Sequence, residues 1–407
     1  MEIKLATYND CTGCGACKAS CNRDAIYFDY DRNGFLRPII DNDKCIGCGL
    51  CAKNCPVLNR EKIKYNDPFK YTCFTAWTKD DELCLKCTSG GVATQLAIDF
   101  IQIPQSIYYG AAISSNNSCQ HIGCVCLEDI KKTIGTKYIQ SDASKAMSDA
   151  KKRILEGWRV LFSGTPCQIA AIYSLIPNRY WDKLYTIELI CHGTPSKKVA
   201  DYNVNYYGCK EMVAYRTKRL GWCKLDGKKV VFAQSLIDAN GNIMYTPVDN
   251  FFHKSFSTIV NPSCSKCFFS QPLRCADIVL GDQWGLINKY PERSNIGASS
   301  VIVTSTKGYK LFVSTKNLYY EENLMSSINA PSFFKPFRKL TYPLISRYFF
   351  VFEIICNKRI MYDLMTLNWR NTWMLIPIKI AENMYSYFRR NDLKNKIIYY
   401  RNLFNWK

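Results

Sequence analysis

Two runs of cysteines near the N-terminus have the spacing that iron–sulfur chemistry requires. The pattern Cys-x2-Cys-x2-Cys-x3-Cys occurs at 11–21 and again at 45–55, so the repeat is about 34 residues long. Three thiolates spaced by two residues wrap three irons of a 4Fe-4S cubane, and the fourth cysteine crosses to the other cluster in two-cluster ferredoxins. Zinc is the alternative, but zinc sites usually show two Cys-x-x-Cys pairs separated by a longer loop. The predicted ligands are Cys11, Cys14, Cys17 and Cys55 for one cluster, and Cys21, Cys45, Cys48 and Cys51 for the other.

A later group of cysteines offers the ligands of a third cluster. Cys264 and Cys267 form a lone Cys-x-x-Cys pair, which by itself is compatible with zinc, a redox dithiol or chance. Cys167 and Cys191 each stand at the end of a predicted strand, and the four thiols together suffice for a third 4Fe-4S cubane. Cys275 is a spare candidate for one of these ligand positions.

Four short polar motifs also follow predicted strands, at 89–91, 164–167, 191–193 and 281–285. Ligands of an α/β sheet bind outside the carboxyl ends of its strands, so four motifs in series predict one composite site. The first two motifs also open predicted helices, where free amides attract phosphate or thiolate. The alternative is that their small residues only make tight turns between strands and helices.

The elements that must position these motifs have the pattern of an α/β region. Short apolar runs rich in β-branched and aromatic residues alternate with segments of helical period. The Asn240-Gly241 pair indicates a hairpin in a more β-like part of the chain. The predicted strands are 73–77, 107–113, 123–127, 159–162, 184–190, 277–280 and 299–304, and the predicted helices are 92–103, 142–156, 165–175 and one from Pro195.

Composition excludes several classes of protein. The chain has 407 residues, of which 47% are hydrophobic and 22% charged, so it is folded and too long for a small disulfide scaffold. It has no run of about 18 apolar residues that would span a membrane, and its N-terminus lacks the apolar core of a signal peptide. We therefore expect a cytoplasmic protein whose 22 cysteines are reduced thiols or metal ligands.

The net charge of +20 is concentrated in the last part of the chain. Residues 331–407 carry 14 basic and 4 acidic side chains, interleaved with aromatic residues on predicted amphipathic helices. Three interpretations stay open: peripheral contact with an anionic membrane surface at the inner face of the membrane, contact with an acidic ferredoxin or another redox protein, or a helical subdomain that covers the core. The segment has no nucleic-acid recognition motif, so we expect no nucleic-acid partner.

Several segments, taken in order, resemble one family. The sequences at 89–94 (SGGVAT), 135–141 (GTKYIQS), 161–172 (LFSGTPCQIAAI), 188–196 (ELICHGTPS), 263–267 (SCSKC) and 276–285 (ADIVLGDQWG) are similar to the beta subunit family of coenzyme F-420 hydrogenase/dehydrogenase. The resemblance runs from about residue 70 to 310, behind the two-cluster ferredoxin module that is often fused to this family. It implies FAD in the α/β region, a cubane on the later cysteines, and electron transfer between ferredoxin-type clusters and a reducible organic partner.

The resemblance also implies a flavin site. Lys137 has a physical rationale there, because a cation near the flavin favours its reduced, anionic form; its alternative interpretation is a surface lysine. Cys87 and Thr88 stand where the family tends to have serines, which puts the contacts there in doubt. The implied flavin contacts are Ser89, Gly90, Gly91, Thr94, Lys137, Tyr138, Gln140, Ser141 and Thr165.

Two residues are candidates for handling protons, which a reductase that takes electrons singly must still deliver. His192 is the one histidine of the three that lies in a site motif, and Asp282 lies in the motif at 281–285. The alternative for His192 is a local hydrogen-bonding role that shapes the turn after Cys191.

The predicted fold class is an α+β ferredoxin-like N-terminal module, an α/β flavin-binding core and a helical, basic C-terminal segment. The expected domains are 1–60, 70–200, 201–330 and 331–407. The predicted function is an iron–sulfur flavoprotein oxidoreductase that passes electrons between 4Fe-4S clusters and FAD to reduce or oxidise an organic substrate or a deazaflavin coenzyme. Stand-alone bacterial members of the family often belong to surface-polysaccharide gene sets. The alternative is a non-catalytic subunit that wires a partner enzyme to the ferredoxin pool.

Overall fold

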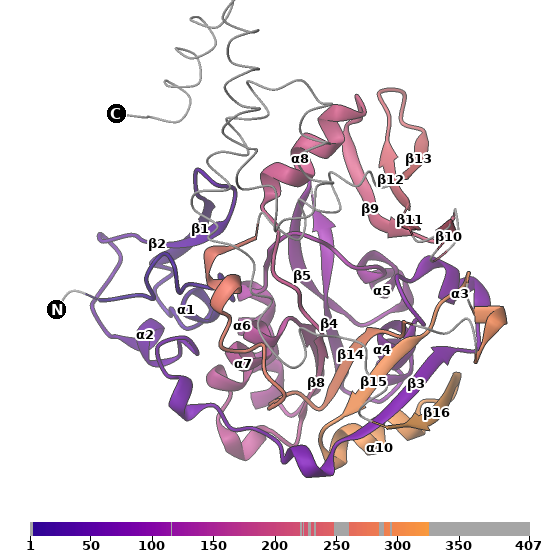
Figure 1. The fold of residues 1–407 in the computed structure, drawn as a ribbon. Helices are drawn as coiled ribbons and strands as arrows, with labels where there is room; N and C mark the ends of the chain where they lie inside the picture. The colour runs from indigo at the N-terminus through magenta and orange to yellow at the C-terminus, as the bar shows by residue number, and fades with distance from the viewer. Residues whose placement is uncertain are drawn as a thin grey trace, which may run out of the picture.

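The structure is a computed structural model (Figure 1). It describes residues 3–114, 116–219, 222, 224–226, 229–231, 233–247, 260–284, 289–293 and 295–324. The basic segment 331–407 lies outside these residues, and so do the interpretations that the sequence leaves open for it. Within the described part of the chain, no helix combines the length and the apolar character that crossing a membrane demands.

A nine-stranded mixed sheet forms the centre of the molecule, in the order β16-β3-β15-β14-β8-β7-β4-β5-β6. Neighbours in the series β14-β8-β7-β4 are parallel, while β15 is antiparallel to both β14 and β3. β3 therefore runs in the same direction as β14. The strands are β3 (Thr72–Thr78), β4 (Ser106–Ser114), β5 (Ser118–Cys124), β6 (Ser141–Asp142), β7 (Arg159–Gly164), β8 (Leu184–Leu189), β14 (Ile278–Asp282), β15 (Ser299–Val303) and β16 (Leu318–Asn323).

Helices cover both faces of this sheet (Figure 1). In β7, Val160 and Phe162 pack with helices α6 and α7 on one face, and Leu161 packs with α4, α5 and α10 on the other. A strand buried on both faces reads as a continuous apolar run, which is why these strands are visible in the sequence. The helices are α4 (Val92–Phe100), α5 (Leu127–Thr133), α6 (Ser144–Leu155), α7 (Pro166–Leu175) and α10 (Thr306–Ser314).

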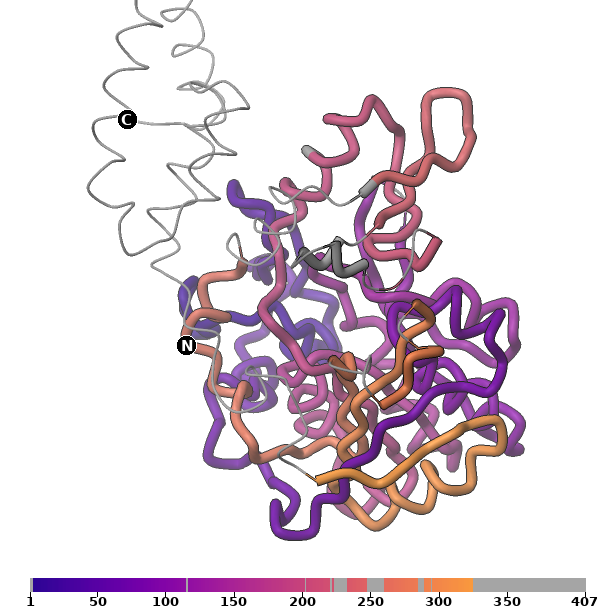
Figure 2. The backbone as a smooth tube through the Cα atoms, turned by 45° about the vertical axis from the view of Figure 1, so that its right-hand side comes forward, coloured from indigo at the N-terminus to yellow at the C-terminus, as the bar shows by residue number. Residues whose placement is uncertain are grey.

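The N-terminal module, residues 3–60, is a small unit that lies against the α6 and α7 face of the sheet. It consists of α1 (Ala16–Ala19), the antiparallel hairpin β1 (Ile26–Tyr30) and β2 (Leu36–Ile40), and α2 (Leu50–Lys53). Ala16 of α1 is fully buried in the same apolar cluster as Met147 of α6. Figure 2 shows the module in indigo beside the segment at 260–275 in salmon, far apart in sequence but adjacent in space.

A three-stranded sheet flanks the main one, in the order β13-β12-β9, with α8 packed near it. Its hairpin turns at Asn240 and Gly241, as the sequence predicts. The remaining elements are α3 (Asp81–Lys86), α8 (Lys197–Tyr206), β9 (Glu211–Thr217), β10 (Lys224–Asp226), β11 (Lys229–Val231), β12 (Ala233–Ile237), β13 (Ile243–Pro247), and the short helices η1 (Arg60–Lys62), η2 (Pro68–Lys70), η3 (Asn178–Tyr180), η4 (Pro262–Lys266) and η6 (Pro291–Arg293).

Most predicted elements match the structure to within a few residues, and the clearest exception is the strand expected at 123–127. β5 ends at Cys124, and Leu127 instead begins α5. Glu128 and Asp129 occupy the first turn of that helix, where acidic side chains favour helix formation.

Candidate metal centres

The four polar motifs of the sequence meet at one edge of the main sheet. β3, β7, β8 and β14 all point the same way, so their carboxyl ends lie along that edge. The motifs at 89–91, 164–167 and 191–193 follow β3, β7 and β8, and Asp282 ends β14. The sequence therefore placed these motifs correctly relative to the strands, and the sheet topology brings them together.

Four cysteines of the N-terminal module line one cavity. The cysteines come from both repeats, and this is the crossed arrangement that a two-cluster ferredoxin requires. Phe28 and Val57 add apolar walls. We call this set of four site 1: Cys11, Cys14, Cys17 and Cys55.

The other four cysteines of the repeats form site 2: Cys21, Cys45, Cys48 and Cys51. Cys51 is buried and interacts electrostatically with Cys48 and Cys21. Cys21 accepts a hydrogen bond from the amide of Ala25 at 3.3 Å. Cys48 is exposed, so site 2 reaches the surface of the protein.

The later cysteines gather around a second cavity. Cys167 lies in the first turn of α7, Cys191 follows β8, and the other two belong to or follow η4. Thr165 and Gln168 close the start of α7 with a capping box, which fixes the position of Cys167 between them. We call this set site 3: Cys167, Cys191, Cys264 and Cys267.

Cys275, the spare candidate, is not among the residues that line the site 3 cavity. It is half-buried and packs against the apolar cluster of Phe269, as Cys167 and Cys267 of site 3 also do.

Sites 1 and 3 contain buried thiols whose ionisation is suppressed. Burial, reinforced by neighbouring sulfurs, raises the pKa of Cys14 and Cys191 well above the usual range. Burial likewise raises the pKa of Cys167 to about 11 and that of Cys267 to about 12. Cluster ligands must be thiolates. These thiols would therefore lose their protons on binding iron, because the positive charge of the metal stabilises the thiolate.

The fit of the cysteines to clusters rests on their shared cavities. No group of three or more His, Cys, Asp or Glu side chains in the described residues is arranged to hold a metal ion. In sites 1 and 3, in contrast, four thiols line one shared cavity, so the number and kind of the donors carry the fit. The donor sets are all sulfur, as 4Fe-4S clusters require.

Sites 1 and 3 are neighbours. Thr12, which sits between the first two ligands of site 1, lines both cavities. Cys14 of site 1 and Cys167 of site 3 also interact electrostatically. Site 1 in turn borders site 2, because Cys17 interacts with Cys51. The three sites therefore form a series in the order site 2, site 1, site 3.

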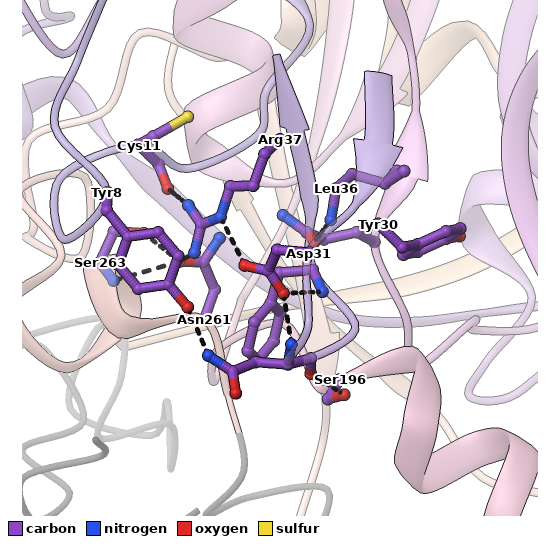
Figure 3. A network of polar contacts seen from close by, with 12 residues as sticks. Tyr8, Cys11, Tyr30, Asp31, Leu36, Arg37, Ser196, Asn261 and Ser263 are labelled. Carbon is purple, nitrogen blue, oxygen red and sulfur yellow. Dashed lines mark hydrogen bonds and ion pairs between the residues drawn. The ribbon is translucent and has the colours of Figure 1, made fainter. Parts of the chain in front are cut away.

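Two side chains join the N-terminal module to the body of the protein beside these sites. Gln140 accepts a hydrogen bond from the amide of Leu36 at 2.7 Å and donates one to the carbonyl of Thr12 at 3.1 Å. Arg37 reaches the carbonyl of Cys11 and the side chain of Asn261 (Figure 3). Neither role is visible in the sequence, because each of these partners lies at least 26 residues away along the chain.

The residues implied as flavin contacts fall into two groups. Gln140, Ser141 and Thr165 lie toward the metal centres, and their polar groups are used by the protein: Ser141, for instance, hydrogen-bonds His121 at 2.7 Å. The others lie around the loop after β3 and at 137–138. There the Ser89 hydroxyl donates to the carbonyl of Ala298 at 2.6 Å, and the Gly90 amide donates to Ser299 at 3.0 Å.

Lys137 is not the surface lysine of the alternative interpretation. Its ammonium donates to the carbonyls of Thr133 at 2.7 Å and Ile134 at 3.0 Å, and burial lowers its pKa to about 8. Thr94 lies beside Cys87, whose sulfur is 3.4 Å from the Thr94 hydroxyl. The loops at 88 and 136 are joined by a 2.7 Å hydrogen bond from the amide of Thr136 to the hydroxyl of Thr88.

The two proton-handling candidates occupy different surroundings. His192 is exposed and lines the site 3 cavity. Asp282 forms an ion pair with the buried Arg216 at 2.6 Å. The Arg216 guanidinium lies 5.5 Å from the ring centroids of both Trp222 and Trp284. Sequence reasoning missed Arg216, which occurs in no motif and gains its partners only through the fold.

Comparison with known proteins finds family matches for two parts of the chain, the N-terminal module and the later region that contains site 3. Residues 10–59 match the family described as 4Fe-4S dicluster domain, and residues 157–325 match the family described as the C terminus of the coenzyme F420 hydrogenase/dehydrogenase beta subunit. Among solved structures, a chain of the F420-reducing NiFe hydrogenase complex from Methanosarcina barkeri is similar at 21% identity and a TM-score of 0.44, over 70% of this chain and 90% of that one. No curated protein matches the chain.

Proposed function

We propose that electrons travel through three clusters in series in this chain. Its residues 10–59 match a 4Fe-4S dicluster domain, and residues 157–325 match the C terminus of the coenzyme F420 hydrogenase/dehydrogenase beta subunit. Iron–sulfur electron transfer follows from the two domains themselves. The proposal adds the third cluster, the order of the three, and an organic acceptor at the sheet edge. It is carried by one observation, that Thr12 lines the cavities of both site 1 and site 3.

In this proposal, electrons enter or leave through site 2. Cys48 of that site is exposed, whereas Cys14 and Cys55 of site 1 are buried. A ferredoxin or another redox protein would therefore dock over site 2 and exchange electrons with it first. Site 1 stands between site 2 and site 3 and would relay electrons from one to the other.

Site 3 lies at the carboxyl edge of the main sheet, where the proposed acceptor would bind. FAD, when bound, supplies a group that takes electrons singly and releases them in pairs. Gly91, Lys137 and Tyr138 belong to the part of the edge that we assign to it. The fit is partial, because Ser89 and Gly90 already use their polar groups on Ala298 and Ser299.

The chain's own residues have assignable tasks near that edge. Asp282 holds the Arg216 guanidinium in place through their 2.6 Å ion pair, so a cation is fixed at the end of β14. His192, exposed beside site 3, is the group that we propose to exchange protons with solvent when the acceptor is reduced. The final acceptor would be an organic substrate or a deazaflavin coenzyme, in a setting such as surface polysaccharide biosynthesis.

A second candidate is a non-catalytic electron-transfer subunit, in which site 3 passes electrons directly to a partner enzyme. The hydrogen bonds that occupy Ser89, Gly90 and Ser141 favour this candidate, because they leave fewer groups for a nucleotide. Turnover of a small substrate by the isolated chain would separate the two functions.

The test is anaerobic purification of the full chain, followed by iron, sulfide and flavin analysis. Three cubanes predict about twelve irons per chain, since each holds four. A value of about eight would remove site 3 from the electron path. Absence of flavin after anaerobic reconstitution with FAD would exclude the flavoenzyme and leave the electron-transfer subunit.

A further inference from the structure

The guanidinium of Arg37 connects the ligand segments of two metal centres. Its Nη1 donates to the carbonyl oxygen of Cys11 in site 1 at 2.8 Å, and its Nη2 donates to Oδ1 of Asn261 at 3.3 Å. Figure 3 shows the side chain extending between these two partners. One residue of the N-terminal module thus contacts segments that lie more than 200 residues apart in sequence.

Asn261 transmits this contact to site 3. The same Oδ1 accepts hydrogen bonds from the amide and hydroxyl of Ser263, both at 3.2 Å, which cap η4. The amide of Cys264, in the same helix, donates to the carbonyl of Asn261 at 2.8 Å. Asn261 is fully buried, so its position is fixed by these bonds. Arg37 is therefore two hydrogen bonds from a ligand of site 3 and one from a ligand of site 1.

The rest of the Arg37 side chain is held as firmly as its two ends. Its Nε donates to Asp31 Oδ2 at 3.1 Å, and the other Asp31 oxygen accepts the amides of Asn33 and Phe35. The guanidinium also lies 4.3 Å from the ring centroid of Tyr8. Side-chain exposure of 11% for Arg37 leaves little contact with water. The planar fork of an arginine donates from three separate nitrogens in fixed directions, which the single nitrogen of a lysine ammonium does not reproduce.

We propose that Arg37 is a positioning residue for electron transfer, which fixes site 1 relative to site 3 and places its guanidinium, ion-paired with Asp31, beside both. The proposal rests on the proposed function, because it assumes clusters in both sites. A nearby cation favours the reduced, more negative state of a cluster, and without Arg37 the carboxylate of Asp31 would lie unpaired near both sites, so the guanidinium should raise both reduction potentials. The guanidinium should also keep the distance between sites 1 and 3 constant, and this distance sets the magnetic interaction between the two reduced clusters.

The test uses the full chain, purified anaerobically, with Arg37→Gln and Arg37→Lys. Potentiometric titration reports each cluster, and low-temperature electron paramagnetic resonance reports the interaction between the reduced clusters. We expect Arg37→Gln to shift the potentials of sites 1 and 3 to more negative values and to change their interaction signal, while site 2 keeps its potential. Arg37→Lys, which keeps the charge but not the fork, should keep the potentials and still change the signal.

The matched control is Ser196→Ala. The Ser196 hydroxyl donates to the carbonyl of Asn33 at 2.5 Å, so it joins the same hairpin to the body without touching a cysteine segment. An equal shift in this control, or wild-type potentials and signals in Arg37→Gln with full iron, would overturn the proposal. If Arg37→Gln loses iron, loss confined to sites 1 and 3 supports the proposal, and equal loss from all three sites contradicts it. Failure of the proposed function is seen separately, as missing iron in the wild-type protein.

Discussion

The side-chain amide of Gln140 rests against Gly13, so that a Cβ added to this glycine would overlap the Gln140 Nε2 atom. Gly13 lies between two ligands of site 1, and Gln140 belongs to the body of the protein. The N-terminal module therefore contacts the body of the protein at Gly13, where the absence of a side chain leaves room for Gln140. The loop that carries the site 1 cysteines is thus also part of the surface that contacts the body.

Gly13→Ala should weaken both folding and iron binding in site 1. The φ of Gly13 is +68°, and an added Cβ would also lie 3.1 Å from the carbonyl of Leu36. Gly49→Ala is the matched control, because Gly49 has a φ of +72° but nothing within 4 Å of its would-be Cβ. The backbone strain of a left-handed alanine is about 1–2 kcal/mol, and overpacking at Gly13 should add about 1–3 kcal/mol. Urea unfolding and iron content measure the difference; equal losses in the two variants would contradict the docking role of Gly13.

Cys191→Ser and Cys275→Ser should differ in iron content. Cys191 lines the site 3 cavity, whereas Cys275 does not line it but packs in the same apolar cluster as Cys167 and Cys267. We expect the Cys191 variant to lose about four irons per chain and the Cys275 variant to keep the wild-type number, since a cubane holds four irons. Iron and sulfide analysis after anaerobic purification measures this, and the reverse result would exchange the roles of the two residues.

His121 should make the stability of the protein depend on pH in the acid range. Its Nε2 donates to the carbonyl of Ser163 at 2.9 Å while Nδ1 accepts from Ser141, so the ring is held neutral, and burial lowers its pKa to about 4 from 6.5. The unfolded chain takes up the proton near pH 6.5 and the folded chain does not. Stability is therefore fully present above pH 6.5 and is lost as pH falls toward 4, by about 3 kcal/mol.

The measurement for His121 is the free energy of unfolding at pH 7 and pH 5, in the native protein and in His121→Gln. Gln can keep polar contacts at this position but does not titrate, so the variant should lose less stability between the two pH values. The same loss in both proteins would assign the pH dependence to other groups.

The buried pair of Arg274 and Glu188 should be costly to break and cheap to replace. Arg274 Nη1 lies 2.7 Å from Glu188 Oε1, and the two side chains are 2% and 1% exposed. Glu188→Gln leaves a buried cation without its charge partner, which should destabilise the protein by about 3–5 kcal/mol. The double variant Glu188→Leu with Arg274→Met should recover most of that loss, as measured by urea unfolding. A double variant as unstable as the single one would show that the pair itself is required.

Local spacing was enough to predict the 4Fe-4S dicluster part of this chain, at residues 10–59. The two cysteine repeats predict clusters with crossed ligands, and the structure brings Cys55 of the second repeat to the cavity of the first. The strands at 159–162 and 184–190 are visible because strands buried on both faces are continuous apolar runs. Once these strands are recognised, the positions of the motifs that follow them are also predicted, because a motif directly after a parallel strand lies at the carboxyl edge of the sheet.

The sequence by itself determined which cysteines are candidate cluster ligands and which strand ends present the polar motifs, because those properties depend on neighbours in the chain. The tertiary structure alone decided how the parts meet. Thr12 between two cavities, Gln140 against Gly13, and Arg37 between Cys11 and Asn261 join segments that no local pattern links. Residues such as Gln140 and Ser141, which the family resemblance implies for a flavin, also make hydrogen bonds within the fold that the sequence did not predict. Such partners are set by tertiary packing, which brings together residues that lie far apart in the sequence.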